Sequence, residues 1–352
     1  MEKRKSFYIN VVKGAAMFLM LWGHCIECCA NGTFTPFDHP LFLGIYSFHM
    51  PLFMLVSGYL FFFSFRKREL KPLLIHRTQG LLQPIVLGGV LNQFFMVLLY
   101  KGMDWGATFL GGSLMPGLNT FWFLWCVLAC SIVVSVACKV TRHWWLQGIL
   151  LVLGSGFIIL FPSPDLFLSM YPFFLLGFFY AKWEIQVPAW VRRLRYLSLA
   201  AFPVLVSFYE TSDSFYITPV YNRSIGITAS AVVDLYRTAV GLAGSLFVMT
   251  LLWEAVRWLY GRRVLEKLLL PLERMGKNSL QLYCISTALI SGYLPVLYPI
   301  AAASIGYNVF EGRMWLYDFV FTPLLAAAYA VLIGLIIVIL KKLRLHELIF
   351  RR

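Results

Sequence analysis

The chain has 352 residues, of which 60% are hydrophobic and 17% aromatic, while only 13% are charged. That charged share is about half of what soluble domains carry, which excludes a soluble globular protein. The net charge of +14 comes from Lys and Arg in short clusters between apolar segments. Such a distribution marks membrane topology rather than a nucleic-acid partner.

Apolar segments recur along the whole chain, and several reach the roughly 20 residues that cross a bilayer. We predict an all-α polytopic membrane protein with about ten transmembrane helices, forming a single domain over residues 1–352. The predicted spans are 7–29, 40–64, 79–100, 119–140, 144–161, 165–182, 195–210, 231–256, 277–299 and 315–340.

The Lys and Arg residues orient these spans. With the N-terminus on the inner side, 25 of the 30 fall in inner segments, three fall in outer links and two lie within spans. Because positive charge accumulates on the cytoplasmic side, this bias predicts that both termini are cytoplasmic.

The first predicted span carries Lys13 and His24 inside the apolar stretch KGAAMFLMLWGH. Eleven residues of helix return almost to the starting angle, so both side chains share one face about 16 Å apart. Ionisable residues within a membrane usually face a protein-lined cavity. We interpret Lys13 as a cation near the inner mouth and His24 as a deeper base. The alternatives are a lysine that extends to the interface and a packed structural histidine.

Glu27 follows His24 by three residues and can reach the same side of the helix. Its carboxylate would orient the imidazole and raise its basicity, as the partner of a general base does. A water-exposed residue at the outer interface is the alternative.

The second span runs back inward with His49 just before Met50-Pro51. Proline removes an amide donor and leaves a carbonyl one turn earlier free to line a cavity. His49 is therefore predicted to lie at a bend, at a depth comparable to that of His24. Ser57-Gly58-Tyr59 supplies small residues that permit close helix packing.

Other polar residues have structural interpretations beside functional ones. Asp234 and Arg237 are three residues apart and are predicted to pair, either as a structural ion pair or as part of an acceptor site. Seven cysteines lie in apolar segments, where they are expected to pack between helices. We predict no metal site.

The motifs, taken in chain order, resemble the acyltransferase-3 family of integral-membrane acyltransferases. The first element of the resemblance is a lysine followed after ten residues by histidine, Lys13 to His24. The later elements are FHMPLFMLVSGY (48–59), RTQGLLQP (77–84), TFWFLW (120–125), YPFFLLG (171–177), YRTAVGLAGS (236–245) and MGKNSLQLYCIS (275–286).

This resemblance implies transfer of an acyl group, commonly acetyl, from cytoplasmic acyl-coenzyme A to a hydroxyl of a surface glycan or its lipid-linked precursor. Acetyl-coenzyme A or another acyl-coenzyme A would be a co-substrate, with no bound cofactor. The resemblance implies a required histidine at His24 and a cation at Lys13. Arg77 and Arg68 are further candidates for binding the donor's phosphates, and membrane topology is the alternative explanation of this basic loop.

One position departs from the family pattern, since its late motif often ends in histidine where this chain has Ser286. Asn278 and Ser279 remain as polar candidates in that motif, for acceptor binding or for structure.

The leading hypothesis is therefore a multi-pass O-acyltransferase of a bacterial inner (cytoplasmic) membrane. His24, with His49, would deprotonate the acceptor hydroxyl or carry the acyl group. The rival interpretations are a transporter or flippase of a lipid-linked glycan with an intramembrane proton relay, and a non-catalytic membrane subunit.

Overall fold

The structure is a computed structural model. It describes residues 2–30, 35–99, 118–158, 160–161, 163–262, 265–292, 310 and 312–350. Every regular element within these ranges is helical, which confirms the predicted all-α class.

The longer helices are α1 (Glu2–Cys29), α2 (Pro40–Lys67), α3 (Leu70–Leu99), α5 (Trp122–Val140), α6 (Trp144–Ile158), α7 (Pro164–Trp183), α10 (Gly226–Leu259), α12 (Ser279–Gly292) and α15 (Thr322–Lys342). The shorter elements are η1 (Pro36–Asp38), α8 (Ala189–Arg193), η3 (Leu194–Leu197), α9 (Ser198–Val206), η4 (Thr211–Asp213), η5 (Leu265–Leu268), α11 (Leu270–Lys277), α14 (Met314–Leu316), η7 (Tyr317–Phe321) and α16 (Leu345–Ile349).

Six helices in the described part of the chain are long and apolar enough to cross a membrane, so the protein is a multi-pass membrane protein. They are Lys3–Cys29, Pro40–Lys67, Trp122–Val140, Pro164–Trp183, Gly226–Leu259 and Met314–Lys342. The total of ten spans and the cytoplasmic placement of both termini stay predictions.

Two expected spans differ from the helices that occupy them. The segment 195–210 contains η3 and the nine-residue α9, which at 1.5 Å per residue is about 14 Å long against a hydrocarbon core of about 30 Å. The segment 277–299 is interrupted at Asn278, where α11 ends and α12 begins. Residues 293–299 of that expected span lie outside the described residues.

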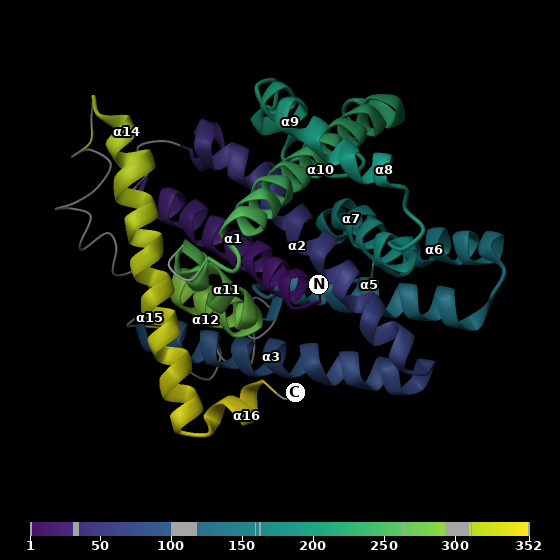
Figure 1. The fold of residues 1–352 in the computed structure, drawn as a ribbon, viewed down its shortest axis with the longest axis horizontal. Coiled ribbons are helices and arrows are strands. Elements are labelled where there is room, and N and C mark those ends of the chain that lie inside the picture. Colours follow the sequence, from purple (N-terminus) through teal and green to yellow (C-terminus); the bar gives the residue numbers. More distant parts are fainter. Residues whose placement is uncertain are drawn as a thin grey trace.

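Helices α1 and α2 lie at the centre of the molecule, and α15 runs along one margin (Figure 1). In the most apolar window of α2, 67% of the residues are buried, compared with 17% for α15. The apolar surface of α15 therefore faces outward, as the surface of a lipid-exposed helix does.

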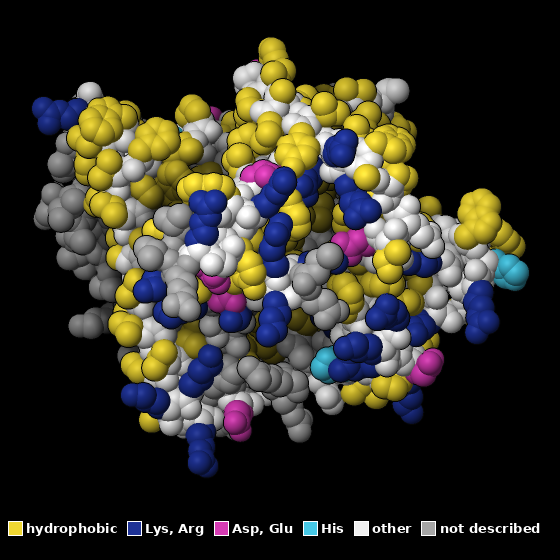
Figure 2. Space-filling model, in the orientation of Figure 1, with side chains coloured by type: hydrophobic (Ala, Val, Ile, Leu, Met, Phe, Trp, Pro, Cys, Tyr) yellow, Lys and Arg dark blue, Asp and Glu magenta, His cyan; other side chains and the backbone are white. Residues whose placement is uncertain are grey.

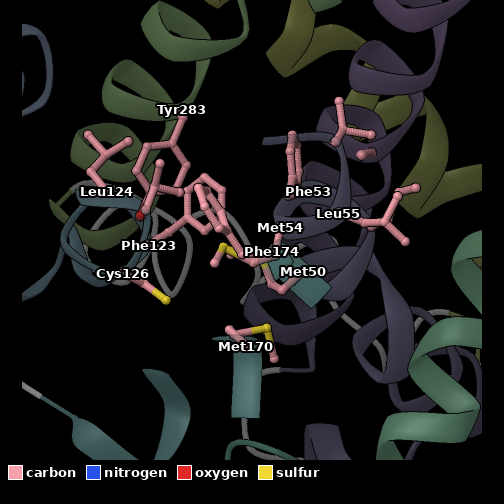
Figure 3. Packing of buried hydrophobic residues seen from close by; sticks show 14 of the residues in the cluster. Met50, Phe53, Met54, Leu55, Phe123, Leu124, Cys126, Met170, Phe174 and Tyr283 are labelled. Atoms are coloured by element: carbon pink, nitrogen blue, oxygen red, sulfur yellow. The ribbon is translucent and has the colours of Figure 1, made fainter. Parts of the chain in front are cut away.

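The core gathers around α2, whose side chains pack against α5, α7 and α12 (Figure 3). Met50, Phe53, Met54 and Leu55 come from α2 itself. Their partners in Figure 3 include Phe123, Leu124, Cys126, Met170, Phe174 and Tyr283.

Glycines allow the central helices to touch backbone to backbone. A Cβ atom on Gly58 of α2 would collide with the Phe174 carbonyl of α7, and one on Gly177 of α7 would collide with the Leu55 carbonyl of α2. Such reciprocal small-residue contacts are the usual basis of close helix packing in membranes. The packing that Ser57-Gly58-Tyr59 predicted is therefore present, although α2 continues to Lys67.

Helix α11 meets α1 in the same manner. A Cβ on Gly14 of α1 would collide with the Leu272 carbonyl, and one on Gly276 of α11 would collide with the Asn10 carbonyl. The helix that bears Lys13 and His24 is therefore held against α11 at Asn10 and Gly14, about three to four turns before His24.

The π-helix η7 and the start of α15 hold the other end of α1. Tyr317 donates a hydrogen bond from its hydroxyl to the Ile26 carbonyl at 2.8 Å. Trp22 donates its indole N–H to Thr322 Oγ1 at 2.9 Å. His39, just before α2, places Nε2 3.1 Å from Asp318 Oδ1 in η7. One short element thus restrains α1 and α2 together.

These contacts predict the effect of one added methyl group. Gly14→Ala should lower the free energy of unfolding in mixed micelles by about 1–3 kcal/mol, because the backbone of α11 has to move away from α1. Gly148→Ala in α6 is the matched control, since a Cβ there has no neighbouring atom within 4 Å. Equal stability of the two variants would contradict the close approach of α11.

Candidate functional site

His24 lies on α1 beside two hydrogen-bonding partners. Its Nδ1 is 3.0 Å from Glu27 Oε2, one turn along the same helix, and 3.2 Å from Tyr46 Oη of α2. The predicted approach of Glu27 to His24 is therefore present. The His24 side chain remains 32% exposed, so the ring is held in place and is still accessible.

The partners determine which ring nitrogen of His24 carries the proton. An ionised carboxylate can only accept hydrogen bonds. With Glu27 ionised, Nδ1–H donates to it, and Nε2 keeps its lone pair for another group. This is the arrangement of an imidazole oriented as a general base.

His49 lies one turn from Tyr46 on α2 and is almost completely buried, at 2% exposure. Its Nδ1–H donates to the Ile45 carbonyl at 3.0 Å. Since a carbonyl oxygen can only accept, Nδ1 of His49 carries the proton, and Nε2 of the neutral ring keeps the lone pair. The two histidines therefore present the same nitrogen, with His24 the more accessible of the two.

Tyr46 connects the two histidines. Its ring centroid lies 6.0 Å from that of His24 and 4.6 Å from that of His49. It stacks on Phe42 at 3.9 Å and contacts Tyr216, which comes from the segment after η4. The Tyr46 ring therefore lies close to both histidine rings. The sequence analysis did not identify this residue.

Gly23 explains how Tyr46 comes so close to α1. A Cβ at this position would lie 2.5 Å from Tyr46 Cε2, well inside van der Waals contact. The glycine before His24 therefore admits the Tyr46 ring. The sequence signals of this contact are a glycine directly before His24 and a tyrosine three residues before His49.

Pro51, where the sequence predicts a bend, does not interrupt α2. Pro51 lies within the continuous helix α2. The Ser47 carbonyl, one turn earlier, faces Gly241 of α10, whose added Cβ would lie 3.2 Å from it. The carbonyl released by the proline therefore lies at a helix contact.

Lys13 is partly buried where α1 packs against α11. Glu273 of α11 is buried and close enough to act electrostatically on the lysine, and it pairs with Lys277 at 2.6 Å. No described residue forms an ion pair with the Lys13 ammonium within 4.0 Å. The lysine therefore retains hydrogen-bond donors for a ligand.

Arg68 lies between α2 and α3, and Arg77 lies in the first half of α3. Arg68 caps α2 and donates from Nη1 to Ser64 Oγ at 3.2 Å. Arg77 places its guanidinium 4.6 Å from the Phe61 ring centroid, and its buried Nε has no hydrogen-bond partner among the described residues. These arginines are neighbours, whereas Lys13 lies against α11.

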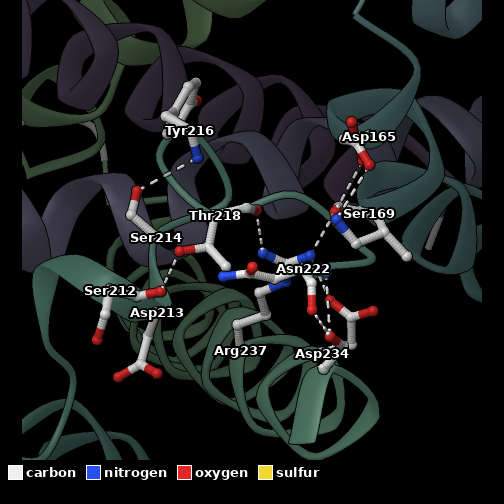
Figure 4. Close-up of polar contacts among 12 residues, drawn as sticks. Asp165, Ser169, Ser212, Asp213, Ser214, Tyr216, Thr218, Asn222, Asp234 and Arg237 are labelled. Carbon is white, nitrogen blue, oxygen red and sulfur yellow. Dashed lines mark hydrogen bonds and ion pairs between the residues drawn. The ribbon is translucent and has the colours of Figure 1, made fainter. Parts of the chain in front are cut away.

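Arg237 is the centre of a polar network that joins α10 to α7 and to the segment after η4 (Figure 4). The side chain is 1% exposed and forms an ion pair with Asp234. It also donates to the Thr218 carbonyl at 2.6 Å and to Ser169 Oγ at 3.3 Å. The predicted Asp234–Arg237 pair is therefore formed. The other hydrogen bonds of Arg237 go to Thr218 and Ser169.

Asn278 and Ser279 lie where α11 gives way to α12. Asn278 donates from Nδ2 to the Arg274 carbonyl and accepts a hydrogen bond from Lys341 Nζ, both at 2.9 Å. Ser279 is the first residue of α12. Ser286, in place of the family's histidine, is buried and donates to the Tyr283 carbonyl at 2.9 Å.

Two cavities are lined by described residues of the helices that carry the candidate residues. The larger, of 1840 Å³, is bordered by basic residues at the N-terminal end of α1 and in α8 and η3. The smaller, of 690 Å³, lies beside the start of α2. The lining of the smaller includes Asp38, Tyr209, Glu210, Thr211 and Ser212. The sequence analysis identified neither cavity, because each is bordered by segments far apart in the chain.

Comparison with known proteins gives a consistent family assignment. The acyltransferase-3 model, described as an acyltransferase domain, matches residues 6–342. Nodulation protein NolL of Mesorhizobium japonicum is 26% identical over 292 residues, covering 81% of this chain and 76% of that protein. Nodulation protein NolL of Sinorhizobium fredii is 30% identical over 189 residues, covering 51% of this chain and 49% of that protein. No solved structure matches this chain.

The Arg237 network predicts a strong effect on stability. Arg237→Met should lower the free energy of unfolding by about 3–5 kcal/mol, because Asp234 and the Thr218 carbonyl lose their buried partner. Arg257→Met is a matched control on the same helix, since Arg257 is 63% exposed and pairs with Glu254 at 3.5 Å. The control should change stability by less than about 1 kcal/mol.

Chemical unfolding in mixed micelles measures both variants. Adding Asp234→Asn to Arg237→Met should restore part of the loss, because the unpaired carboxylate is removed. Equal effects of the Arg237 and Arg257 substitutions would mean that the buried network does not hold the two helices together.

Proposed function

The chain belongs to the acyltransferase-3 family and is a membrane acyltransferase, and from this premise we propose its reaction. The protein transfers an acyl group, acetyl by preference, from acyl-coenzyme A to a hydroxyl group of a cell-surface glycan or of its lipid-linked precursor. The observation that carries the proposal is the His24 side chain, which is 32% exposed while its Nδ1 is held by Glu27.

His24 acts as the general base. The acceptor hydroxyl gives its proton to Nε2, its oxygen bonds to the thioester carbonyl carbon, and the carbon–sulfur bond breaks. The coenzyme A thiolate then takes the proton from the imidazolium. The products are the ester and free coenzyme A. Glu27 stabilises the imidazolium while it exists, as the carboxylate behind a catalytic histidine does.

We assign His49 to the acceptor side of the same site. Its unprotonated Nε2 can accept a hydrogen bond from an acceptor hydroxyl, while its Nδ1 is held by Ile45. The alternative order of steps, in which an imidazole first takes the acyl group, uses the same residues. Label retained on the protein without acceptor would identify that order.

Lys13, Arg68 and Arg77 are assigned to the donor. Acyl-coenzyme A carries several phosphate charges, and basic side chains bind phosphate by charge-assisted hydrogen bonds. The support is that Lys13 and the Arg77 Nε lack partners among the described residues. Acyl-coenzyme A is here a co-substrate, and the reaction requires no bound cofactor.

The smaller cavity is assigned to the glycan acceptor. Carboxylates and hydroxyls border it, including those of Asp38, Glu210 and Thr211, and such groups hydrogen-bond to sugar hydroxyls. Phe37, also in its lining, places its ring 6.2 Å from that of Tyr46, which contacts His24. Asp234, Arg237, Asn278 and Ser279 are assigned to structural support.

The membrane orientation follows from the charge bias. We place the protein in a bacterial inner (cytoplasmic) membrane with the basic ends of the helices in the cytoplasm, where acyl-coenzyme A is available. The acceptor then meets the acyl group near His24, within the membrane.

The decisive experiment supplies purified wild type and His24→Ala with radiolabelled acetyl-coenzyme A and a panel of glycan acceptors. His24→Ala should lose about 10²–10⁴-fold in transfer rate, because the base is removed. His143→Ala, in the link before α6, is the control and should retain activity. Transfer unaffected by His24→Ala, or donor-independent glycan flux in liposomes, would overturn the proposal.

The donor assignment has a separate test. Lys13→Ala should raise the apparent KM for acetyl-coenzyme A by about 10- to 100-fold, the value of a charge-assisted hydrogen bond. Lys13→Arg should keep most of the affinity, and Lys71→Ala, an exposed lysine of α3, should leave it unchanged. Equal loss in the Ala and Arg variants of Lys13 would exclude a phosphate contact.

A further inference from the structure

The 1840 Å³ cavity lies apart from the proposed catalytic residues. It is enclosed by α1, α2, α7 and α10, with α8 and η3 at its border. Ligand pockets usually occupy roughly 300–1,000 Å³, so this one can hold a large molecule. Its described lining includes neither His24 nor Lys13, and the proposed function does not use it.

Basic side chains gather at the border of this cavity. They are Lys3, Arg4, Lys5, Arg192, Arg193 and Arg195. Figure 2 shows Lys and Arg side chains over the part of the surface where the N-terminal end of α1, α8 and α10 meet.

Most of this positive charge is not neutralised by the described residues. The carboxylate of Glu184 is engaged by Lys5 at 2.6 Å and by the Tyr59 hydroxyl at 2.9 Å. Arg195 pairs with Glu254 at 3.7 Å, whereas Arg4, Arg192 and Arg193 have no carboxylate within 4.0 Å in the described part of the chain. The border therefore favours an anionic ligand.

Two of the arginines converge on one indole ring. The guanidinium of Arg4 lies 5.3 Å from the Trp253 ring centroid, and that of Arg195 lies 5.1 Å from it. Arg195 also has a buried Nε without a hydrogen-bond partner among the described residues. Both guanidinium groups therefore lie beside one ring at the border of the cavity, and guanidinium groups bind the oxygen atoms of phosphate by charge-assisted hydrogen bonds.

The interior of the cavity is apolar. Val12, Leu55, Val56, Leu242 and Leu246 supply its walls.

Two of the hydroxyls in the cavity lining are engaged by the protein. Tyr8 donates to the Met249 carbonyl at 2.8 Å, and Thr250 donates to the Arg195 carbonyl at 3.4 Å. Amides and hydroxyls, such as those of a pantetheine arm or a sugar, would be buried there without partners, which is costly. A hydrocarbon chain carries no such cost.

The border also includes apolar side chains that face outward. Leu176 of α7 is 46% exposed, Leu194 of η3 is 48% exposed, and Ile185 after α7 is 96% exposed. A chain can therefore pass from the lipid phase into the cavity along an apolar surface. Basic pockets between membrane helices on the cytoplasmic side are known binding sites for anionic lipid headgroups.

From these contacts we infer that the cavity binds an anionic phospholipid. The phosphate lies at Arg4, Arg192 and Arg195, and an acyl tail occupies the space between α1, α2 and α10. This lipid is neither the donor nor the acceptor of the transfer reaction, and its binding does not depend on that reaction. It fills the gap beside the two helices that carry His24 and His49.

The test measures binding by native mass spectrometry of the purified full-length chain. Phosphatidylglycerol is added to delipidated protein in detergent, and parallel samples receive phosphatidylcholine, palmitoyl-coenzyme A or inorganic phosphate. Phosphatidylglycerol should bind at one saturable site, more tightly than phosphatidylcholine and without competition from inorganic phosphate. Stronger binding of palmitoyl-coenzyme A at this site would overturn the inference and assign the cavity to the acyl donor.

Two variants distinguish headgroup binding from tail insertion. Arg4→Gln with Arg192→Gln should weaken phosphatidylglycerol binding about tenfold or more, because two charge contacts are lost. Arg66→Gln with Lys67→Gln, two exposed residues at the end of α2, is the matched control. Leu246→Phe should also weaken binding by narrowing the interior while leaving the basic residues in place.

Folding of each variant is checked by thermal unfolding and size-exclusion chromatography. Retention of lipid by the Arg4/Arg192 variant at the level of its control would refute the phosphate site. Unchanged binding in a folded Leu246→Phe variant would refute insertion of the tail. Because lipid binding is read without any acyl transfer, an inactive preparation still tests the inference.

Discussion

The structure depends on the direct contact of helix backbones at a few glycines. Lipid is as apolar as leucine, so burial of apolar side chains supplies little force between helices within a membrane. Close packing and polar contacts have to hold them instead. Gly58 with Gly177 brings α2 onto α7, and Gly14 with Gly276 brings α1 onto α11. These contacts set the rotation of α1 and α2, and that rotation determines which side chains meet between them.

The meeting of His24, Tyr46 and His49 is the chemical outcome of that rotation. Gly23 admits the Tyr46 ring to α1, and η7 holds the nearby end of α1 through the hydrogen bond from Tyr317 to Ile26. A base that transfers a proton needs its reacting nitrogen in a defined place. Packing alone cannot define the tautomer of an imidazole, but hydrogen bonds at Nδ1 can.

The sequence predicted what depends on neighbours within one helix. The spacing of His24 and Glu27 placed them in contact, and Asp234 with Arg237 formed the expected pair. Contacts between helices required information that spacing does not contain. Tyr46 was missed because its approach to His24 depends on the rotation of two helices, and the cavity bordered by Arg4 and Arg195 was missed for the same reason. The helix found within the span predicted at 195–210 has nine residues, since apolar composition alone does not determine where a helix begins and ends.

The way in which the two histidines are held affects how the site can change. His24 is oriented by Glu27 on its own helix, and His49 by the Ile45 carbonyl on its own helix. The contacts with Glu27 and Ile45 do not depend on the spacing between α1 and α2, whereas the 3.2 Å contact of His24 with the Tyr46 hydroxyl does. A substitution that widens the gap would therefore enlarge the room for a substrate and remove the Tyr46 contact, while Nδ1 of each imidazole keeps the partner on its own helix. The volume open to a substrate can thus change without loss of the groups that orient the two rings.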